Sequence, residues 1–287
     1  MTDTIQAITQ SQTNITNATI QLNALNPAKL AQFYQEAIGL SLITEDGDYY
    51  ALGTPGGPAL IEIYPTDHTD SSPRAGLYHL ALLLPNRSEL GDIFKHLLDH
   101  SVPLDGASDH GYSEALYLKD PEGNGIEIYA DKDRSEWNIL DNGLIAGIVE
   151  PMDAEGVLAS GTGQFKGLSP ETILGHVHLH VGNLEETFQF YHQIMGLGLK
   201  YIMNGQAAFM ATGLSHHQLG VNLWKGKGIP KAKADTQGLR ACIWQGSASD
   251  LAWIEEQLQA HQVDYQKVNG QLEFSDNSGV PIIVRTI

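Results

Sequence analysis

The segment AQFYQEAIGL at residues 31–40 decides the fold, because a close copy of it, FQFYHQIMGL, returns at residues 188–197. An apolar-alternating segment precedes each copy, and alternation with a period of two predicts a β-strand. The copied segment itself has apolar residues at helical spacing and ends at a glycine, Gly39 or Gly196. A repeat of this kind indicates that one structural unit occurs more than once in the chain.

Two further copies of the unit fill the rest of the sequence. The segment LKDPEGNGIEIY at residues 118–129 aligns with FSDNSGVPIIVR at residues 274–285, and each follows an apolar strand and a helical stretch. The expected order is one strand, one helix and three strands, four times over. The sequence therefore predicts an α+β fold of four βαβββ modules. Its curved mixed sheets would enclose a cleft, with alternate side chains of each strand pointing into it.

The modules predict two domains of two modules each in the 287-residue chain. We expect a polar tail at residues 1–14, a first domain at residues 15–132, a connector at residues 133–171 and a second domain at residues 172–287. The connector has no copy elsewhere, and its Gly, Asp and Ser content is typical of an irregular segment.

Charge and composition exclude several classes of function. The net charge is −18 and no run of Lys and Arg occurs, so we expect no nucleic-acid partner and no binding to an anionic membrane surface. No window reaches the roughly 20 apolar residues of a membrane span, and the N-terminus does not read as a secretory signal. The one cysteine, Cys242, excludes an internal disulfide and predicts a cytoplasmic location.

One strand carries three histidines on the same face. In GHVHLHV, residues 175–181, strand alternation puts His176, His178 and His180 side by side. The pattern indicates a metal site, although a polar outer face on an exposed strand would look the same. The sequence leaves open which of His176 and His178 is the ligand, because that depends on strand register.

Two other ligand-type residues lie in apolar strands. His79 falls within LYHLALLLP, where a histidine bonded to the backbone is the more common explanation, and Glu127 falls within GIEIYAD. A carboxylate in such a strand is costly to bury unless it is paired or bound to a metal. The corresponding positions of the fourth module hold Arg240 or Ala241, and Ile283.

The first module likewise has Thr19 where the third has His176. Ligand-type residues therefore occur in the middle two modules and are missing from the outer two, whereas a scaffold feature would occur in all four. We predict one metal centre between modules 2 and 3, built from His79, Glu127 and His176.

At this point the chain resembles the vicinal oxygen chelate superfamily, which includes glyoxalase I, the fosfomycin and bleomycin resistance proteins and the type I extradiol dioxygenases. Extradiol members carry a His, five to seven residues, an aliphatic-Tyr pair, two residues, an acidic-Pro-x-Gly turn and a Glu. Here His110 is followed by five residues, a Leu, Tyr117, two more, the turn at residues 120–123 and Glu127. Ser108 stands where the family usually has Gly or a small aliphatic residue.

The resemblance implies an Fe(II)-dependent extradiol ring-cleaving dioxygenase, with Mn(II) as the alternative ion. Its substrates would be O2 and catechol or a substituted catechol, and its product a semialdehyde. Two histidines and a carboxylate on one face of an octahedron leave three positions open for substrates. The implied roles are metal ligation by His79, Glu127 and His176, acid/base catalysis by His217, hydrogen-bond donation by His110 and Tyr117, and substrate contact by His178.

Several alternatives stay open. The better-known extradiol enzymes keep their catalytic residues in the second half of the chain, whereas here they are split between the halves, so the site forms within one chain or across a homo-oligomer. A glyoxalase-like isomerase or a thiol transferase would use a fourth ligand, for which Glu62 is the candidate. A metal-free protein that binds a small aromatic compound is the third reading. Trp224 and Tyr129 would line the pocket or pack in the core.

Overall fold

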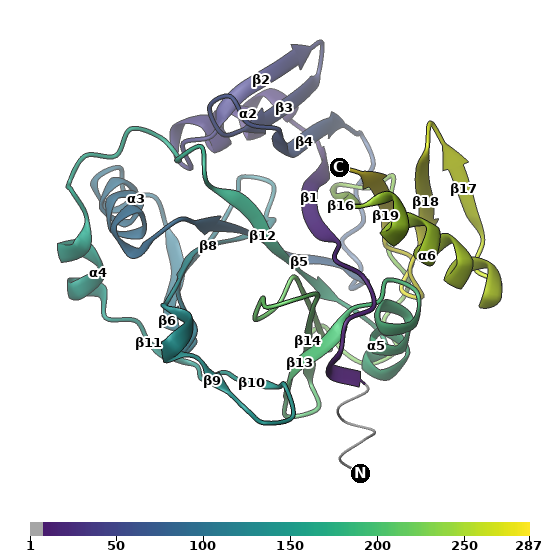
Figure 1. Cartoon of the computed structure of the whole chain (residues 1–287). Helices are drawn as coiled ribbons and strands as arrows, with labels where there is room; N and C mark the ends of the chain where they lie inside the picture. The colour runs from purple at the N-terminus through teal and green to yellow at the C-terminus, as the bar shows by residue number, and fades with distance from the viewer. Residues whose placement is uncertain (1–7) are drawn as a thin grey trace.

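A computed structural model describes residues 8–287 (Figure 1). Its elements follow the order expected for four modules. Module 1 comprises β1 (Thr16–Ala24), α2 (Pro27–Glu36), β2 (Ser41–Asp46), β3 (Tyr49–Gly53) and β4 (Ala59–Pro65). Module 2 comprises β5 (Gly76–Leu84), α3 (Arg87–Asp99), β6 (Leu104–Asp109), β7 (Ser113–Lys119) and β8 (Gly125–Asp131). The α+β fold of βαβββ modules is confirmed.

The second half repeats the same order after a connector. Module 3 comprises β12 (Ile173–His180), α5 (Leu184–Gln193), β13 (Gly198–Met203), β14 (Ala207–Ala211) and β15 (Leu219–Asn222). Module 4 comprises β16 (Gly238–Gly246), α6 (Ala248–Ala260), β17 (Tyr265–Val268), β18 (Gln271–Ser275) and β19 (Pro281–Thr286). The connector holds η1 (Arg134–Glu136), β9 (Asn138–Ile139), β10 (Ile145–Ala146), β11 (Glu150–Pro151) and α4 (Ala154–Ser160).

Each large sheet takes one module from each half of the chain. The eight-stranded sheet has the order β17-β18-β19-β16-β1-β4-β3-β2, so it joins modules 4 and 1. The nine-stranded sheet has the order β11-β6-β7-β8-β5-β12-β15-β14-β13, so it joins modules 2 and 3 and adds β11 of the connector. The first strands of the paired modules meet antiparallel at the centre, β1 with β16 and β5 with β12. The domain boundaries at residues 132 and 172 stay a prediction.

Polar side chains define where the module helices begin. Asn26, Asn86 and Asn183 each accept a hydrogen bond from a backbone N–H of the first helical turn, and Ser247 forms a reciprocal capping box with Asp250. These caps satisfy N–H groups that have no partner within the helix. The module helices pack against the sheets, as α3 does against β8, while α4 packs against α3 (Figure 1).

The repeated aromatic pair and the repeated turn contact each other, and this contact joins modules of different sheets. The Tyr34 hydroxyl in α2 donates to Asp120 Oδ2 at 3.0 Å, and the Tyr191 hydroxyl in α5 donates to Asp276 Oδ2 at 3.0 Å. Both tyrosines are fully buried. Each half of the repeat therefore contains a tyrosine–aspartate hydrogen bond, which joins module 1 to module 2 in the first half and module 3 to module 4 in the second.

The turn glycine is needed for the backbone conformation of this motif. Gly123 has φ +88° and donates its N–H to the Asp120 carbonyl oxygen, while Gly279 has φ +78° and donates to that of Asp276. Only glycine adopts such positive φ values at no steric cost.

Asp276 makes stability depend on pH. Burial raises the pKa of its carboxyl group to about 6, although the Val280 N–H and the Tyr191 hydroxyl oppose that rise. The unfolded chain ionises an aspartate near pH 4. The stabilising contribution of protonated Asp276 is therefore complete below about pH 4 and is lost as the pH rises to about 6.

We expect Asp276→Asn to remove this dependence. The free energy of unfolding of the wild type, taken relative to that of the variant, should fall by roughly 2–3 kcal/mol between pH 4 and pH 6 and stay constant above that range. Denaturant titrations at half-unit pH steps measure it. The exposed Asp264→Asn is the matched control. Parallel pH profiles for wild type and Asp276→Asn would contradict the assignment.

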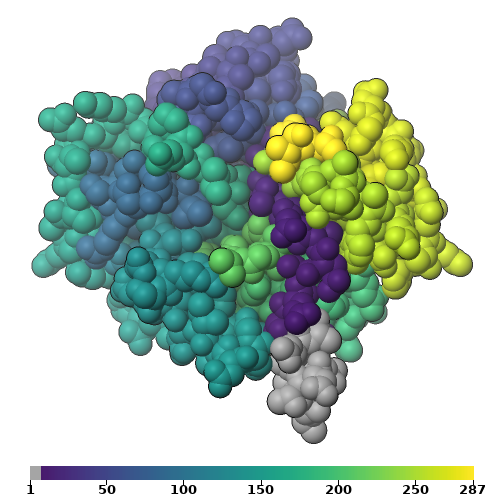
Figure 2. Space-filling model, viewed as in Figure 1, coloured from purple at the N-terminus to yellow at the C-terminus, as the bar shows by residue number. Residues whose placement is uncertain are grey.

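Part of the polar tail packs on the body of the protein. Residues 1–7 of the tail prediction lie outside the described residues. The Gln12 N–H donates to the Gly196 carbonyl oxygen, and the Thr13 hydroxyl donates to that of Met195. In Figure 2 the purple N-terminal segment runs beside the yellow fourth module.

No helix in residues 8–287 has the length and apolar character required to cross a membrane.

Candidate metal centre

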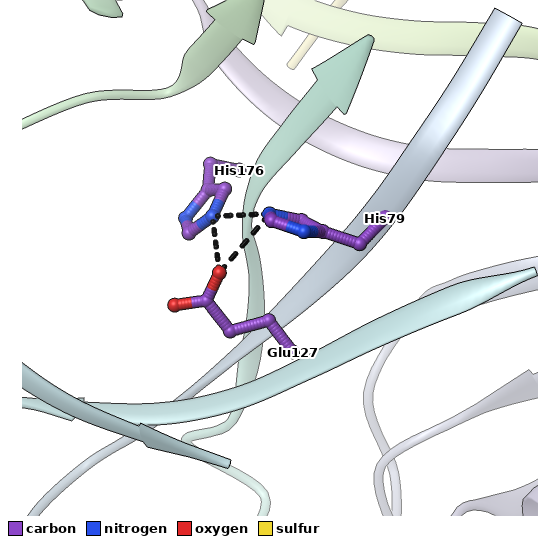
Figure 3. Close-up of side chains that lie close together, drawn as sticks. All are labelled: His79, Glu127 and His176. Carbon is purple, nitrogen blue, oxygen red and sulfur yellow. Dashed lines mark hydrogen bonds and ion pairs between the residues drawn. The ribbon is translucent and has the colours of Figure 1, made fainter. Parts of the chain in front are cut away.

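Three neighbouring strands at the centre of the nine-stranded sheet supply His79, Glu127 and His176. His79 lies in β5, Glu127 in β8, which is parallel to β5, and His176 in β12, which is antiparallel to it. All three side chains are at most 5% exposed. Figure 3 shows them pointing toward one another from these strands. The two modules that the sequence analysis paired thus bring the three residues together within one chain.

The three donor atoms form a nearly equilateral triangle. His79 Nε2 lies 3.0 Å from Glu127 Oε2, His176 Nε2 lies 3.1 Å from the same oxygen, and the two nitrogens are 3.3 Å apart. Donors about 2.1 Å from an octahedral ion and on one of its faces lie about 3.0 Å apart. Among the described residues, no other group of three His, Cys, Asp or Glu side chains converges in this way. The geometry fits a metal ion held by two histidines and one carboxylate.

The charges of the cluster fit a cation as well. Burial raises the pKa of Glu127, but His176 and His79 more than offset that effect and hold the pKa well below its usual range. Burial lowers the pKa of His176 to about 4, with only partial compensation by Glu127. An ionised carboxylate beside a neutral imidazole is the protonation state that metal binding requires.

The structure distinguishes His176 from His178. His176 belongs to the cluster, whereas His178 pairs with His79 across the two strands, with ring centroids 5.0 Å apart. Nε2 of His178 is buried and makes no hydrogen bond within residues 8–287, and the residue lines the adjacent pocket. Gly220 lies under this ring, where a Cβ atom would come within 2.8 Å of His178 Cγ.

The turn at residues 120–123 joins β7 to β8 and places Tyr117 beside the cluster. Tyr117 of β7 is the direct cross-strand partner of Glu127, and both line the pocket. His110 Nε2 lies 2.6 Å from the Tyr117 hydroxyl, and His110 Nδ1 lies 3.1 Å from the carbonyl oxygen of Ile148 in the connector. Because a carbonyl only accepts, a neutral His110 donates from Nδ1 and accepts the Tyr117 proton at Nε2. Burial, followed by the charge of Glu127, raises the pKa of Tyr117 well above its usual value.

The two adjacent histidines of SHHQ differ in their surroundings. His217 lines the pocket, and its ring centroid lies 4.1 Å from that of His176. His216 points away from the pocket to Asp131, whose carboxylate oxygen lies 3.0 Å from His216 Nε2. Burial, together with His176 and His216, holds the pKa of His217 well below its usual range.

The pocket over the cluster has a volume of about 410 Å³. Its polar lining includes His79, Glu127, Tyr117, His178 and His217. Its apolar and aromatic lining includes Tyr78, Tyr112, Ile148, Val149, Tyr201, Met203, Phe209 and Trp224. Trp224 therefore lines the pocket. Tyr129 does not, and instead packs beneath it, with its ring centroid 5.0 Å from that of His176.

Sequence reasoning missed the part of the pocket that the connector forms. Gly147, Ile148 and Val149 line it, and the Ile148 N–H bonds to the His110 carbonyl oxygen at 3.1 Å. The connector has no copy in the repeat, so no symmetry argument pointed to it. Its exposed apolar pair, Ile148 and Val149, was the available signal.

The eight-stranded sheet holds a different arrangement at its centre. The Gln21 amide and the Tyr64 hydroxyl both donate to Glu62 Oε2, at 2.8 and 3.1 Å. Glu62 thus has hydrogen-bonding partners of its own in module 1 and lies in the other sheet from Glu127.

Comparisons with known proteins agree with this fold. Residues 17–128 match the model of the Glyoxalase/Bleomycin resistance protein/Dioxygenase superfamily. The chain is 37% identical over 213 residues to Catechol-2,3-dioxygenase of Bacillus subtilis, covering 72% of this chain and 74% of that protein. The chain therefore belongs to the Glyoxalase/Bleomycin resistance protein/Dioxygenase superfamily. Within it, this is a catechol-2,3-dioxygenase-like chain.

More distant matches include one relative found by sequence and two solved structures with the same fold. Biphenyl-2,3-diol 1,2-dioxygenase 2 of Rhodococcus globerulus is 27% identical over 101 residues, which cover 35% of this chain and 50% of that protein. A solved putative dioxygenase from Bacillus subtilis superposes with a TM-score of 0.63 at 15% identity, covering 96% of this chain and 86% of that one. Glyoxalase I from Zea mays gives a TM-score of 0.58 at 12% identity, covering 94% of this chain and 92% of that one.

Proposed function

We propose that the protein is an Fe(II)-dependent extradiol dioxygenase that uses O2 to cleave the ring of catechol or a substituted catechol beside its diol. The observation that carries this proposal is the triangle of His79, Glu127 and His176, two of which, His79 and Glu127, line a pocket. The sequence similarity of the chain to Catechol-2,3-dioxygenase of Bacillus subtilis supports the same reaction. His79, Glu127 and His176 would hold the iron.

An Fe(II) ion in this place would supply a Lewis acid that favours the anionic form of a diol, together with the redox capacity for reaction with O2. The chain contributes orientation and proton transfer. His217 faces the pocket as a neutral imidazole and is placed to take the proton that a diol releases on binding. His178 and the apolar walls would hold the ring, since both border the same pocket.

Tyr117 and His110 form the hydrogen-bonding side of the pocket. The Tyr117 hydroxyl keeps its proton and donates a hydrogen bond to His110 Nε2, 2.6 Å away. Tyr117 would stabilise negative charge that develops on the substrate by donating its proton to such an oxygen in place of its hydrogen bond to His110. Tyr117 also lies directly opposite Glu127, so the donor and the proposed ligand keep a fixed spacing.

The test is to load the purified protein with Fe(II) without oxygen, then add catechols and air. We expect oxygen uptake and a yellow ring-fission product, one equivalent of each per catechol consumed. Absence of both across a panel of catechols would overturn the proposal. Turnover of a thiol adduct with Ni(II) or Zn(II) would identify a glyoxalase-like isomerase or thiol transferase instead, and refusal of all metals would identify a metal-free binder of aromatic compounds.

The pocket favours catechols whose ring substituent carries no charge. None of the described residues that line the pocket is Lys or Arg, and its carboxylates are Asp105 and Glu127. Asp105 lies at the outer part of the pocket and pairs with Lys119 at 3.3 Å, where both side chains are more than half exposed. An anionic substituent would lose water without gaining a cationic partner.

We therefore expect kcat/KM for 3- or 4-methylcatechol to exceed that for a carboxylate-bearing catechol by at least about tenfold, equivalent to about 1.4 kcal/mol. Asp105→Asn should raise the value for the carboxylate compound several-fold and leave the methylcatechols unchanged. Steady-state oxygen uptake measures both. Equal values for the neutral and the anionic compounds would show that the pocket does not select by charge.

We also propose a cytoplasmic location, since the one cysteine, Cys242, is buried and forms no disulfide.

A further inference from the structure

We propose that His216 and Asp131 are positioning residues that keep the proton of His217 on Nδ1 and thereby present its unprotonated Nε2 to the pocket. This inference rests on the proposed function in assigning His217 the task of a base. The hydrogen bonds that join His217, His216 and Asp131 do not depend on His217 acting as a base.

Three side chains form a continuous hydrogen-bonded chain. His217 Nδ1 lies 2.6 Å from His216 Nδ1, and His216 Nε2 lies 3.0 Å from Asp131 Oδ1. His216 is 3% exposed and His217 is 6% exposed, whereas the Asp131 side chain keeps 31% of its surface in contact with solvent. These hydrogen bonds therefore connect a partly solvated carboxylate, Asp131, to a residue that lines the pocket, His217.

The order of donors along this chain follows from what each group can do. An ionised carboxylate only accepts hydrogen bonds, so His216 Nε2 carries a proton and donates it to Asp131. The other nitrogen of a neutral His216, Nδ1, is then an acceptor. The hydrogen bond between the two rings consequently needs the proton on His217 Nδ1, which leaves the lone pair on His217 Nε2. Among the described residues, that Nε2 atom has no hydrogen-bond partner of its own.

Aromatic packing holds the middle ring in the orientation that the chain requires. Tyr112 stacks on His216 with a centroid distance of 4.3 Å and an interplanar angle of 17°, and Trp137 of the connector meets it edge-on at 5.4 Å. A ring held from two sides cannot rotate to exchange its nitrogens without displacing these neighbours. His217 in turn packs against Phe209, with centroids 4.9 Å apart.

One strand, β8, carries both the proposed metal ligand Glu127 and Asp131, the last residue of the hydrogen-bonded series. Asp131 is the last residue of β8, four positions after Glu127, so alternation along the strand puts the two side chains on one face. His216 and His217 come from the loop between β14 and β15 in the other half. The pairing of modules 2 and 3 therefore sets the position of the base as well as that of the metal cluster.

A purely structural role would depend on ring packing, and a positioning role would depend on the acceptor atom. Two substitutions separate them. His216→Phe keeps the aromatic ring against Tyr112 and removes the acceptor. His216→Asn loses the ring and keeps an acceptor oxygen near the place of Nδ1.

For the Fe(II)-loaded variants we expect His216→Phe to lower kcat by roughly 10–100-fold with KM within about twofold of wild type, the usual effect of removing an outer hydrogen-bond partner. His216→Asn should keep a kcat several-fold above that of His216→Phe. An unchanged kcat in His216→Phe would overturn the inference, as would an equal loss in both variants with folding intact by circular dichroism.

The second measurement does not use activity. Side-chain ¹⁵N spectra of the full-length chain loaded with diamagnetic Zn(II) report which nitrogen of each histidine carries the proton, and His217→Gln assigns the signal. We expect His217 in the Nδ1–H form in wild type and a shift toward the Nε2–H form in His216→Phe. The Nε2–H form in wild type would overturn the inference even if every variant were active. The Nδ1–H form in a protein without ring-cleavage activity would refute the proposed function and leave the hydrogen-bonded chain established.

Discussion

Glu127→Gln is expected to abolish stoichiometric iron binding and to lower ring-cleavage activity by at least about 10³-fold, because the neutral amide removes the one negative charge among the three donors. The substitution conserves volume, so the packing of β8 between β5 and β7 should survive. Iron content by elemental analysis and oxygen uptake measure the two effects. Circular dichroism verifies that the sheet has formed.

Glu62→Gln is the matched control for this prediction. Glu62 also lies on an inner strand and accepts two hydrogen bonds, but it belongs to the eight-stranded sheet. The control should keep full iron content and activity. If Glu127→Gln bound iron as wild type does, or if Glu62→Gln lost it, the centre would not lie where we propose.

His217→Gln is expected to keep iron at wild-type stoichiometry and to lower kcat by about 10²–10⁴-fold, the range that a positioned acid/base group contributes. Glutamine retains hydrogen-bonding capacity but does not take up a proton near neutral pH. Iron content and single-turnover kinetics separate binding from chemistry.

His261→Gln provides the comparison for His217→Gln, since His261 is an exposed residue at the end of α6. That variant should behave as wild type. A His217→Gln enzyme with wild-type kcat would remove His217 from the mechanism, and one that loses iron would make it part of the metal site rather than a base.

The sequence predicted those elements of the fold that bury apolar residues. The strand β8 was placed from its apolar pattern with its observed bounds. The edge strands β2 and β17 were not placed individually, because their side chains are mostly exposed and show no alternation between an apolar and a polar face. The four-module repeat supplied their number but not their positions.

The part of the candidate site that could be predicted is the part that a comparison of the four modules identifies. Ligand-type residues that are present in two modules and absent from the other two singled out His79, Glu127 and His176, and their convergence is a feature of the structure. The contact between His216 and Asp131 was missed because 85 residues separate them and nothing local marks Asp131. Only the pairing of β8 and β12 on either side of β5 brings them together.

The crossed pairing of modules has a consequence for synthesis on the ribosome. His79 and Glu127 are translated well before His176, and β1 stays without its partner β16 until almost the whole chain has been made. Domains usually fold as they emerge, N-terminal part first. Here the first half can complete neither sheet alone, so a nascent polypeptide should bind the proposed iron only after β15 has left the exit tunnel, and a chain that ends before His176 should not bind it.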